Sequence, residues 1–413
     1  MPPAGRERGI GDVAEIADRA VVHRASLKDA VTARAQAMPA LMPLTQVSAS
    51  QWRALAERAV EPNGYYLPDW ELAVSASARG RTGVFALGAW SDASLARLIG
   101  LVPVISMWRA YKIPLPALVS ADPYGTLSTP PLDRDMTEDA VIRLMRQARK
   151  AGAHALILRD LSLDGAAMKT FTEVLRLSGM RPRLLQSHLR ACLDATRDAD
   201  ELLRDALGAK KLKELRRQRN RLAEHGAVSF EVARTPDDIA AALEGFLALE
   251  ASGWKAERGT ALAQDDGDAG FIRRAAPALA ENRQCEIVTL RTGDTPVAAA
   301  IVLRHRDRAF YFKLGVDERF AKLSPGVQLT LDLTRHLCAD PAIAMVDSTA
   351  SPDHPMINPI WRGRLAIGDI LIPLRPKDPV VPLIHAALGV RKLIREPARR
   401  AVRFIRSRQE KWS

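Results

Sequence analysis

The spacing of hydrophobic and polar positions predicts strands that alternate with helices along most of the chain. In the first half, the apolar runs 82–90 (TGVFALGAW) and 95–108 (LARLIGLVPVISMW) predict two strands of a hairpin, joined by a short Ser/Asp turn. A further strand is expected over 154–161 (HALILRDL), with helical spacing on either side of it over 138–151 and 165–178. This order of elements predicts an α/β fold.

The same order returns in the second half, after a polar stretch. We expect one helix over 200–207 that ends at Gly208, followed by a strongly basic helix over 210–224. Beyond Gly226 the pattern predicts strands over 228–234, 285–291, 296–304, 309–316, 342–348 and 369–374, and helices over 237–252, 269–281, 326–338 and 358–365. Each half is thus expected to be a sheet of mixed strands with flanking helices.

Length and composition fit two folded domains. A chain of 413 residues exceeds what one hydrophobic core usually serves, and 47% apolar with 26% charged residues is typical of a globular protein. The order of elements places the domains at 41–195 and 196–375. A flexible leader is expected over 1–40 and a basic, amphipathic helical tail over 376–413.

The net charge of +12 is concentrated in two segments of the chain. Residues 209–221 carry seven Lys/Arg and one Glu, and residues 376–413 carry ten Lys/Arg and three acidic residues. Clustered charge indicates an anionic partner, so the basic helix could steer an anionic substrate or a nucleic acid. A solvated helix face without a partner is the alternative.

The tail has an apolar side that alternates with arginine. Apolar residues recur at helical spacing at Ala398, Ala401, Val402 and Ile405, opposite Arg399, Arg400, Arg403 and Arg406. A cationic helix of this kind binds anionic membrane surfaces. Docking onto the protein's own domains is the alternative, and both stay open.

Several classes of protein are excluded by what the sequence lacks. No run of about 18 apolar residues predicts a spanning helix, and the first residues lack the apolar core of a signal peptide. We therefore expect a cytoplasmic protein, with peripheral contact at the inner membrane face as the alternative. Neither a disulfide framework nor a zinc site is expected from the widely spaced Cys192, Cys285 and Cys338. Phosphate-loop, GxSxG and HExxH motifs are missing, and no metal is predicted.

The most informative segment runs over 309–337, where an apolar strand leads through an irregular loop into a helix that opens at Ser324, Pro325 and Gly326. The first N–H groups of a helix lack backbone partners and the helix dipole favours negative charge, so this arrangement can bind an anion. Gly326 lets a phosphate approach the backbone, and Lys322 is close in sequence. The alternative is an ordinary helix capped by Ser324 and started by Pro325.

Both halves resemble one family of proteins. The second half, from about 200 to 373, resembles the catalytic domain of the GNAT-fold family described as BioF2-like or cellulose-biosynthesis CelD-like acetyltransferases, related to the FemAB group. The matching segments are RRQRNRLAEHG (216–226), EASGWKAERGTAL (250–262), YFKLGVDERFAKLSPGVQL (311–329) and VDSTASPDHPMINPIWRGRLAIGD (346–369). The first half resembles the family's degenerate N-terminal GNAT-like domain through PDWELA (68–73) and PYGTLSTPPLD (123–133).

The resemblance implies a tandem pair of GNAT-like domains, each a mixed, mostly antiparallel sheet flanked by helices, with the second domain catalytic. It also implies acetyl-CoA or another acyl-CoA as co-substrate. In GNAT enzymes the pantetheine arm lies between the strands that correspond to 309–316 and 342–348, so backbone groups of Leu314 and Val316 are expected to contact it. The CoA pyrophosphate is expected at Lys322, Ser324, Gly326 and Val327.

Acyl transfer from a thioester needs few catalytic side chains, because the thioester is already activated. The enzyme has only to position the acceptor and remove its proton. Asp347 at a strand end and His354 in the following loop are the predicted catalytic residues. The alternative for Asp347 is that it only caps the following turn, and the alternative for His354 is a solvated side chain without a catalytic role. An aromatic and basic group suited to a sugar ring and an anion is predicted to bind the substrate, formed by Trp254, Lys255, Arg258 and Trp361.

The predicted function is transfer of an acyl group from acyl-CoA to an amine or hydroxyl. A saccharide or lipid precursor from envelope or extracellular polysaccharide biosynthesis is the acceptor class we consider. One alternative is aminoacyl transfer from charged tRNA, which the basic helix favours. Another is a non-catalytic adaptor at a membrane surface, favoured because Gly326 is the only glycine of the usual [QR]xxGx[GA] loop that this chain retains.

Overall fold

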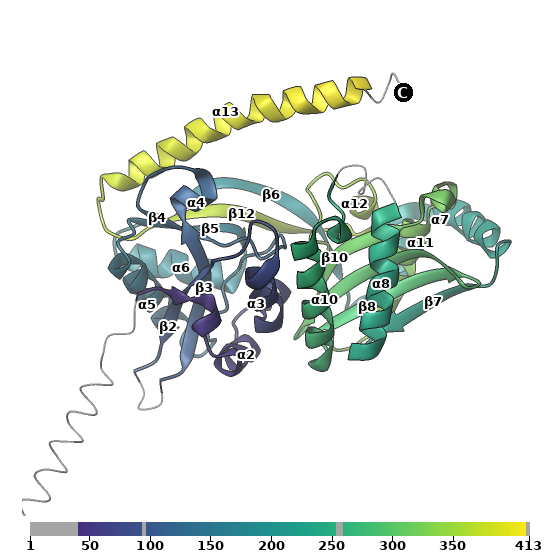
Figure 1. Ribbon diagram of the computed structural model, residues 1–413, viewed down its shortest axis with the longest axis horizontal. Helices are drawn as coiled ribbons and strands as arrows, with labels where there is room; N and C mark the ends of the chain where they lie inside the picture. Colours follow the sequence, from purple (N-terminus) through teal and green to yellow (C-terminus); the bar gives the residue numbers. More distant parts are fainter. Residues whose placement is uncertain (1–39, 93–95, 253–258, 410–413) are drawn as a thin grey trace, which may run out of the picture. The chain divides into compact units, whose positions relative to one another are not determined.

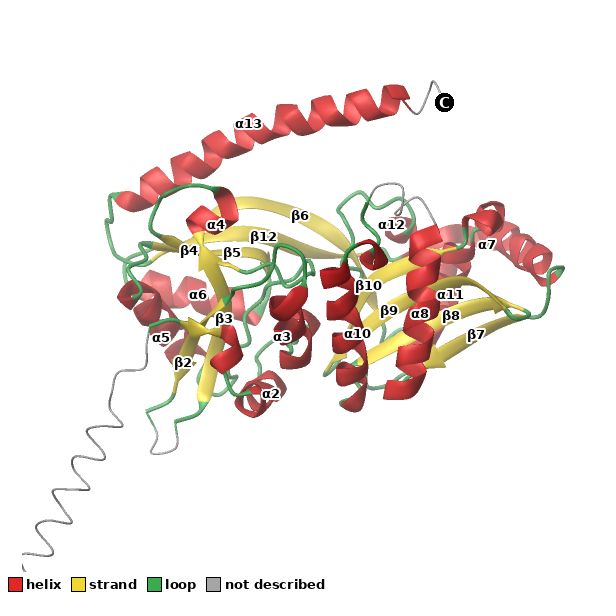
Figure 2. Cartoon of the chain, viewed as in Figure 1, coloured by secondary structure: helices red, strands yellow, loops and turns green. Residues whose placement is uncertain are grey.

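The computed structural model describes residues 40–92, 96–252 and 259–409, and for residues 395–409 it describes the backbone only. Figure 1 shows the chain coloured by sequence and Figure 2 its helices and strands. The predicted leader over 1–40 lies outside the described residues, apart from its last residue. Residues Leu41–Ser413 form one compact unit.

Twelve strands of the described chain form one sheet in the order β1-β2-β3-β4-β5-β12-β6-β11-β10-β9-β8-β7. Neighbours are antiparallel except at two places, where β4 pairs in parallel with β5 and β10 with β11. The strands are β1 (Met42–Pro43), β2 (Phe85–Trp90), β3 (Leu98–Ser106), β4 (Ala117–Ser120), β5 (Ala155–Ser162), β6 (Arg183–Asp194), β7 (Val228–Ala233), β8 (Cys285–Thr292), β9 (Thr295–His305), β10 (Arg308–Val316), β11 (Met345–Asp347) and β12 (Gly363–Pro373). This confirms the mixed, mostly antiparallel sheet.

Helices flank this sheet (Figure 2). The α-helices are α2 (Ala49–Glu57), α3 (Pro68–Ser77), α4 (Met107–Tyr111), α5 (Thr137–Lys150), α6 (Ala166–Leu177), α7 (Ala199–Ala223), α8 (Pro236–Ser252), α10 (Asp266–Glu281), α11 (Pro325–Cys338), α12 (Ile357–Ile360) and α13 (Val380–Gln409). The 3₁₀ turns are η1 (Leu44–Gln46), η2 (Gly64–Tyr66), η3 (Leu262–Gln264) and η4 (Glu318–Leu323). Most of the predicted elements are present, with ends that differ by a few residues.

The predicted break at Gly208 is confirmed. Gly208 has φ 72° and ψ 163° inside α7, a backbone conformation that only glycine adopts without strain, so α7 is two helices that meet at a kink. Leu215 and Leu222 bury the inner face of its second part, and most of its lysines and arginines are exposed. The basic helix is therefore amphipathic and anchored along one side.

Strand β12 joins the two halves of the chain. It comes last in sequence but lies between β5 and β6, pairing with Ala155–Ser162 on one side and with Arg183–Cys192 on the other. Strand β6 in turn pairs with β11 of the second half. The halves thus share strands within one sheet, and the predicted domain boundaries at 195 and 375 stay a prediction.

An aromatic core packs the two halves against each other. Tyr65 and Trp70 of the first half make edge contacts with Phe310 and Phe312 of β10, with ring centroids 4.9–6.1 Å apart. Buried aromatic side chains each contribute on the order of 1.5–3 kcal/mol. A buried polar contact adds to them, because the backbone N–H of Asn63 donates to His305 Nδ1 at 2.9 Å. The first half therefore fixes the position of β10.

Candidate functional site

A cavity of about 440 Å³ opens where β10 and β11 separate, and we name it the β10–β11 cavity. The two strands pair only over Arg308–Phe310 of β10, whereas β10 continues to Val316. The edge of β10 beyond Phe310 is therefore open on this side among the described strands. Leu314 and Val316, predicted to contact the pantetheine arm, both line the cavity.

A bulge in β10 lies at the edge of this cavity. The register with β9 shifts between Tyr311 and Lys313, which makes Phe312 the extra residue. Phe312 packs against the aromatic core, while Lys313 places its Nζ 2.9 Å from Oε1 of the buried Glu250 on α8. The bulge thus brings two successive side chains toward the same side of the sheet.

The N-terminus of α11 closes one end of the β10–β11 cavity, and Ser324, Gly326 and Val327 all line the cavity there. A Cβ atom built on Gly326 would lie 3.0 Å from Leu314 Cδ2 and 3.1 Å from Val316 Cγ1. A larger residue at position 326 would therefore have to push these two side chains aside by a few tenths of an ångström, and glycine avoids this. Lys322 is exposed in η4, three residues before α11 begins at Pro325.

Ser324 does not cap α11 in the expected way. Its backbone is left-handed, with φ 52° and ψ 52°, and its side chain makes no capping hydrogen bond, so the interpretation as an ordinary Ser-capped helix is wrong. The start at Pro325 is confirmed. The backbone N–H of Ser324 donates to Ala321 O at 3.0 Å and is occupied. Of the three predicted N–H donors, Gly326 and Val327 remain the candidates for an anion.

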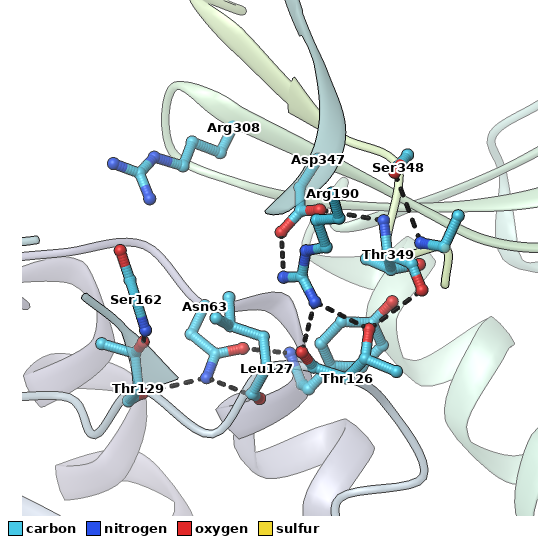
Figure 3. Close-up of polar contacts among 12 residues, drawn as sticks. Asn63, Thr126, Leu127, Thr129, Ser162, Arg190, Arg308, Asp347, Ser348 and Thr349 are labelled. Carbon is cyan, nitrogen blue, oxygen red and sulfur yellow. Dashed lines mark hydrogen bonds and ion pairs between the residues drawn. The ribbon is translucent and has the colours of Figure 1, made fainter. Parts of the chain in front are cut away.

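Asp347 ends β11 in a buried ion pair with Arg190 of β6 (Figure 3). Arg190 is completely buried and also donates to the backbone oxygen of Thr126 from the first half. The other carboxylate oxygen of Asp347 accepts the N–H of Thr349 at 2.8 Å. Both carboxylate oxygens of Asp347 accept hydrogen bonds from other protein groups. This geometry favours a role in positioning the loop after β11 over a role in proton abstraction.

Thr349 connects the ion pair to β10. Its backbone is left-handed, with φ 49°, and its hydroxyl donates to the carbonyl oxygen of Tyr311 at 2.7 Å. The hydroxyl of Thr126 donates to Thr349 O at 3.0 Å (Figure 3). These bonds hold the loop after β11 between β10 and the first half of the chain.

His354 and Trp361 lie in different surroundings. His354 lines the β10–β11 cavity, and its Nδ1 accepts the N–H of Ile357 at 3.3 Å, which places the proton of the neutral ring on Nε2. Trp361 is only 1% exposed, and its indole N–H donates to Thr334 at 2.9 Å in the core behind β10. The substrate-binding role predicted for Trp361 is therefore wrong, because its ring is enclosed by protein. The predicted Trp254, Lys255 and Arg258 lie outside the described residues.

A second cavity of about 360 Å³, which we name the Tyr124 cavity, lies between the two halves. It lies next to the β10–β11 cavity, and three residues line both cavities, namely Phe312, Lys313 and Thr349. Gly125 permits its shape, because a Cβ atom there would lie 2.3 Å from the Tyr65 ring. Charged and aromatic groups of the first half line the rest, including Arg81, Asp122, Tyr124, Arg159 and Asp160.

Sequence reasoning missed the side chains of the Tyr124 cavity. Arg81 lies over the Tyr124 ring at 4.2 Å and binds Asp122 at 3.0 Å. Tyr124 lies in the segment PYGTLSTPPLD, which is part of the family resemblance. This position is the one signal in the sequence that points to the cavity. The first half was expected to be degenerate, and no chemistry was assigned to it.

Asp160 is the most perturbed carboxylate of the Tyr124 cavity. Burial, with the nearby charge of Asp369, raises the pKa of Asp160 from 3.8 to about 6. Its backbone N–H donates to Asp369 Oδ1 at 2.9 Å, and its φ of 45° is left-handed for a residue other than glycine. Local strain and a perturbed pKa at a cavity wall together indicate a functional position.

Comparison with protein families assigns the second half. Residues 209–354 match the family model described as an acetyltransferase (GNAT) domain. The assignment to a GNAT-type acetyltransferase domain is therefore made for residues 209–354 alone. The matched residues include β10, η4, α11 and β11, and therefore most of the β10–β11 cavity. The Tyr124 cavity depends on residues from outside the match as well.

Solved structures share the fold over most of the chain at low sequence identity. FemX is 12% identical, with 84% of this chain and 99% of that chain covered and a TM-score of 0.55. The C-terminal domain of a putative lysylphosphatidylglycerol synthetase from Agrobacterium fabrum is 14% identical, with 82% and 95% covered and a TM-score of 0.50. A conserved protein of unknown function from Bacteroides thetaiotaomicron is 13% identical, with 79% and 98% covered and a TM-score of 0.50. Among curated proteins, none is significantly similar in sequence to this chain.

The described residues contain neither a candidate membrane-spanning helix nor a candidate metal site. No described helix combines the length and apolar character needed to cross a membrane. No cluster of three or more His, Cys, Asp or Glu in the described part of the chain could hold a metal ion.

Proposed function

We propose that this protein transfers an acyl group from acyl-CoA, bound in the β10–β11 cavity, to an amine or hydroxyl acceptor in the Tyr124 cavity. The observation that carries the proposal is that the two cavities lie side by side at the bulge of β10 and share the residues that form it. An acyl thioester entering from one side and a nucleophile from the other would come together beside Phe312 and Lys313. Support for a transferase comes from the GNAT match.

The β10–β11 cavity fits the donor. No described strand pairs with β10 on this side beyond Phe310, so a pantetheine arm can lie there as an added strand, beside the cavity wall that includes Leu314 and Val316. The first turn of α11 offers N–H groups of Gly326 and Val327 to the pyrophosphate, with the helix dipole and the exposed Lys322 favouring its negative charge.

The proposed chemistry is attack by the acceptor on the thioester carbonyl, loss of the CoA thiolate and transfer of the acceptor's proton to the protein. We assign the proton to Asp160, since a carboxylate with a pKa near 6 is ionised at neutral pH and basic enough to accept it. His354 is proposed as a hydrogen-bond donor to the departing sulfur, because its bond from Ile357 leaves Nε2 protonated. Asp347 then acts as a positioning residue.

The acceptor class is inferred from the lining of the Tyr124 cavity. Asp122 and Asp160 favour a cationic or hydroxylated group, and the half-buried Tyr124 offers an aromatic surface that suits a sugar ring. A saccharide or lipid precursor of envelope or polysaccharide biosynthesis remains the proposed class of acceptor.

Replacing Ser324 by aspartate should weaken acetyl-CoA binding at least about tenfold, or about 1.4 kcal/mol, as measured by titration calorimetry. The new carboxylate would face the pyrophosphate at the start of α11, where two negative charges repel. Helix stability should be retained, because aspartate is a favoured N-cap residue and tolerates the left-handed backbone.

The matched control is Ser48→Asp, at the N-cap of α2. It adds the same charge at the same helix position without touching the cavity, and its affinity should equal that of the wild type. Equal affinity of Ser324→Asp and wild type would contradict the donor site. If the wild type bound neither acetyl-CoA nor longer acyl-CoAs, the acyl-CoA proposal itself would fail.

Aminoacyl-tRNA is the second candidate donor, and the exposed cations of α7 favour it. Lys210, Lys213, Arg216, Arg217 and Arg221 are exposed and form no ion pair with a described residue. A polyanion bound there would release counterions, so its affinity should fall steeply with salt.

Under the tRNA proposal, Lys213→Glu combined with Arg217→Glu should lower tRNA affinity about tenfold or more in a filter-binding assay, and flatten its salt dependence. The control is Arg181→Glu with Arg183→Glu, two exposed arginines of the first half. A weak, salt-independent interaction in the wild type would exclude tRNA as donor.

A further inference from the structure

The last helix, α13, is attached to the rest of the protein along one side. Val381 and Ile384 are buried in a cluster with residues of α4, β4, β5 and β12. Arg391 lies 4.8 Å over the ring of Tyr111 and donates to its carbonyl oxygen at 3.2 Å. These residues fall at positions i, i+3 and i+10, so they define one inner face of the helix.

A different side of α13 carries large apolar residues that are exposed. The exposed fractions are 59% for Leu383, 56% for Val390, 72% for Leu393 and 68% for Ile394. Leu383, Val390 and Ile394 fall at i, i+7 and i+11, which places them on one stripe, with Leu393 beside it. We name these four residues the outer stripe. Four such side chains on one helix are more than scattered surface residues, and indicate an apolar surface with a partner.

The charge of α13 indicates the nature of this partner. The helix contains eight Lys/Arg and one Glu. Along the sequence, apolar positions continue among these cations at Ala401 and Ile405, which are spaced by 7 and 11 residues from Ile394. A partner that accepts apolar side chains and many cations at once must be apolar inside and anionic at its surface.

An anionic bilayer has both properties. A second copy of α13 would cover the outer stripe but bring eight cations against eight others, which is unfavourable. A nucleic acid would neutralise the cations but leave the leucine and isoleucine side chains in water. We therefore infer that α13 lies in the headgroup region of an anionic membrane, with the outer stripe inserted and its lysines and arginines at the lipid phosphates.

This arrangement places the Tyr124 cavity near the membrane surface. A third cavity, of about 500 Å³, lies beneath α13 and is lined by Leu388 and Lys392 of that helix. It shares Arg159 and Asp160 with the Tyr124 cavity. Membrane docking itself requires none of the proposed chemistry, so the two can be tested separately.

The test is sedimentation of the full chain with vesicles of phosphatidylglycerol and phosphatidylcholine, beside vesicles of phosphatidylcholine alone. We expect binding to the anionic vesicles, weaker binding at high salt, and at least about tenfold weaker binding to the neutral vesicles. Leu393→Ser combined with Ile394→Ser should lower the affinity for anionic vesicles about tenfold or more, because the apolar contribution is lost.

The matched control is Leu177→Ser with Leu184→Ser, which removes two exposed leucines from other elements. This variant should bind anionic vesicles like the wild type, and both variants should keep the wild-type melting temperature and acetyl-CoA affinity. The inference is overturned if the α13 variant binds vesicles as well as the control. It is also overturned if the wild type is a dimer by analytical ultracentrifugation and the α13 variant a monomer, since a second copy would then cover the outer stripe.

Discussion

Replacing Arg190 by methionine is expected to lower the free energy of unfolding by about 3–5 kcal/mol. Arg190 is completely buried and pairs with Asp347, so methionine would leave that carboxylate in the interior without its counter-charge. The bond to the backbone oxygen of Thr126 would be lost as well. Urea unfolding followed by fluorescence at neutral pH measures the change.

The double variant Arg190→Met with Asp347→Leu is expected to recover most of this loss. A buried ion pair replaced by apolar residues is often nearly neutral, whereas a broken pair is costly. The double variant should also lose acyl transfer more than acetyl-CoA affinity, since the loop carrying Thr349 would lose the bond to Asp347 that holds it between the cavities. A cost below about 1 kcal/mol for Arg190→Met would contradict the buried pair.

The residues of the proposed donor side could be singled out from the sequence because they are close together along the chain. The strand over 309–316, the loop and the helix opening at Pro325 form one continuous segment, and the patterns that mark a strand end and a helix start are local. The break at Gly208 was predictable for the same reason, since only glycine fits there without strain.

The acceptor side could not be predicted, because its contacts join residues far apart in sequence. Arg190 meets Asp347 across 157 positions and Thr126 across 64, and no local pattern marks either contact. They depend on β12 entering between β5 and β6 and on β6 pairing with β11. Trp361 is the opposite case, a residue that the sequence singled out but that is buried in the structure. An aromatic residue in a segment that resembles a family can pack the core as readily as it binds a ligand.

Replacing Asp160 by asparagine is expected to stabilise the protein at pH 8 by roughly 2–3 kcal/mol. The pKa of Asp160 is raised from 3.8 to about 6, so the unfolded chain loses this proton at a lower pH than the folded protein does. The wild type therefore loses stability as the pH rises from about 4 to 6, and the loss is constant above that range. Asparagine does not ionise, so the variant does not lose stability over this pH range. Urea unfolding at pH 4 and pH 8 should show equal stability at the first and the gain at the second.

The same change should lower the kcat/KM for acyl transfer by about 10²-fold, since general-base catalysis typically contributes this much or more, while the affinity for acetyl-CoA is retained. The wild-type rate should rise with pH through about 6. Asp369→Asn is the informative control, because it removes the charge that helps to raise the pKa of Asp160 and keeps the oxygen that accepts its N–H. Its rate should rise at a lower pH than that of the wild type. Full activity of Asp160→Asn, or an unmoved profile in Asp369→Asn, would remove Asp160 from the mechanism and leave the proton acceptor to be sought among the other residues of the Tyr124 cavity.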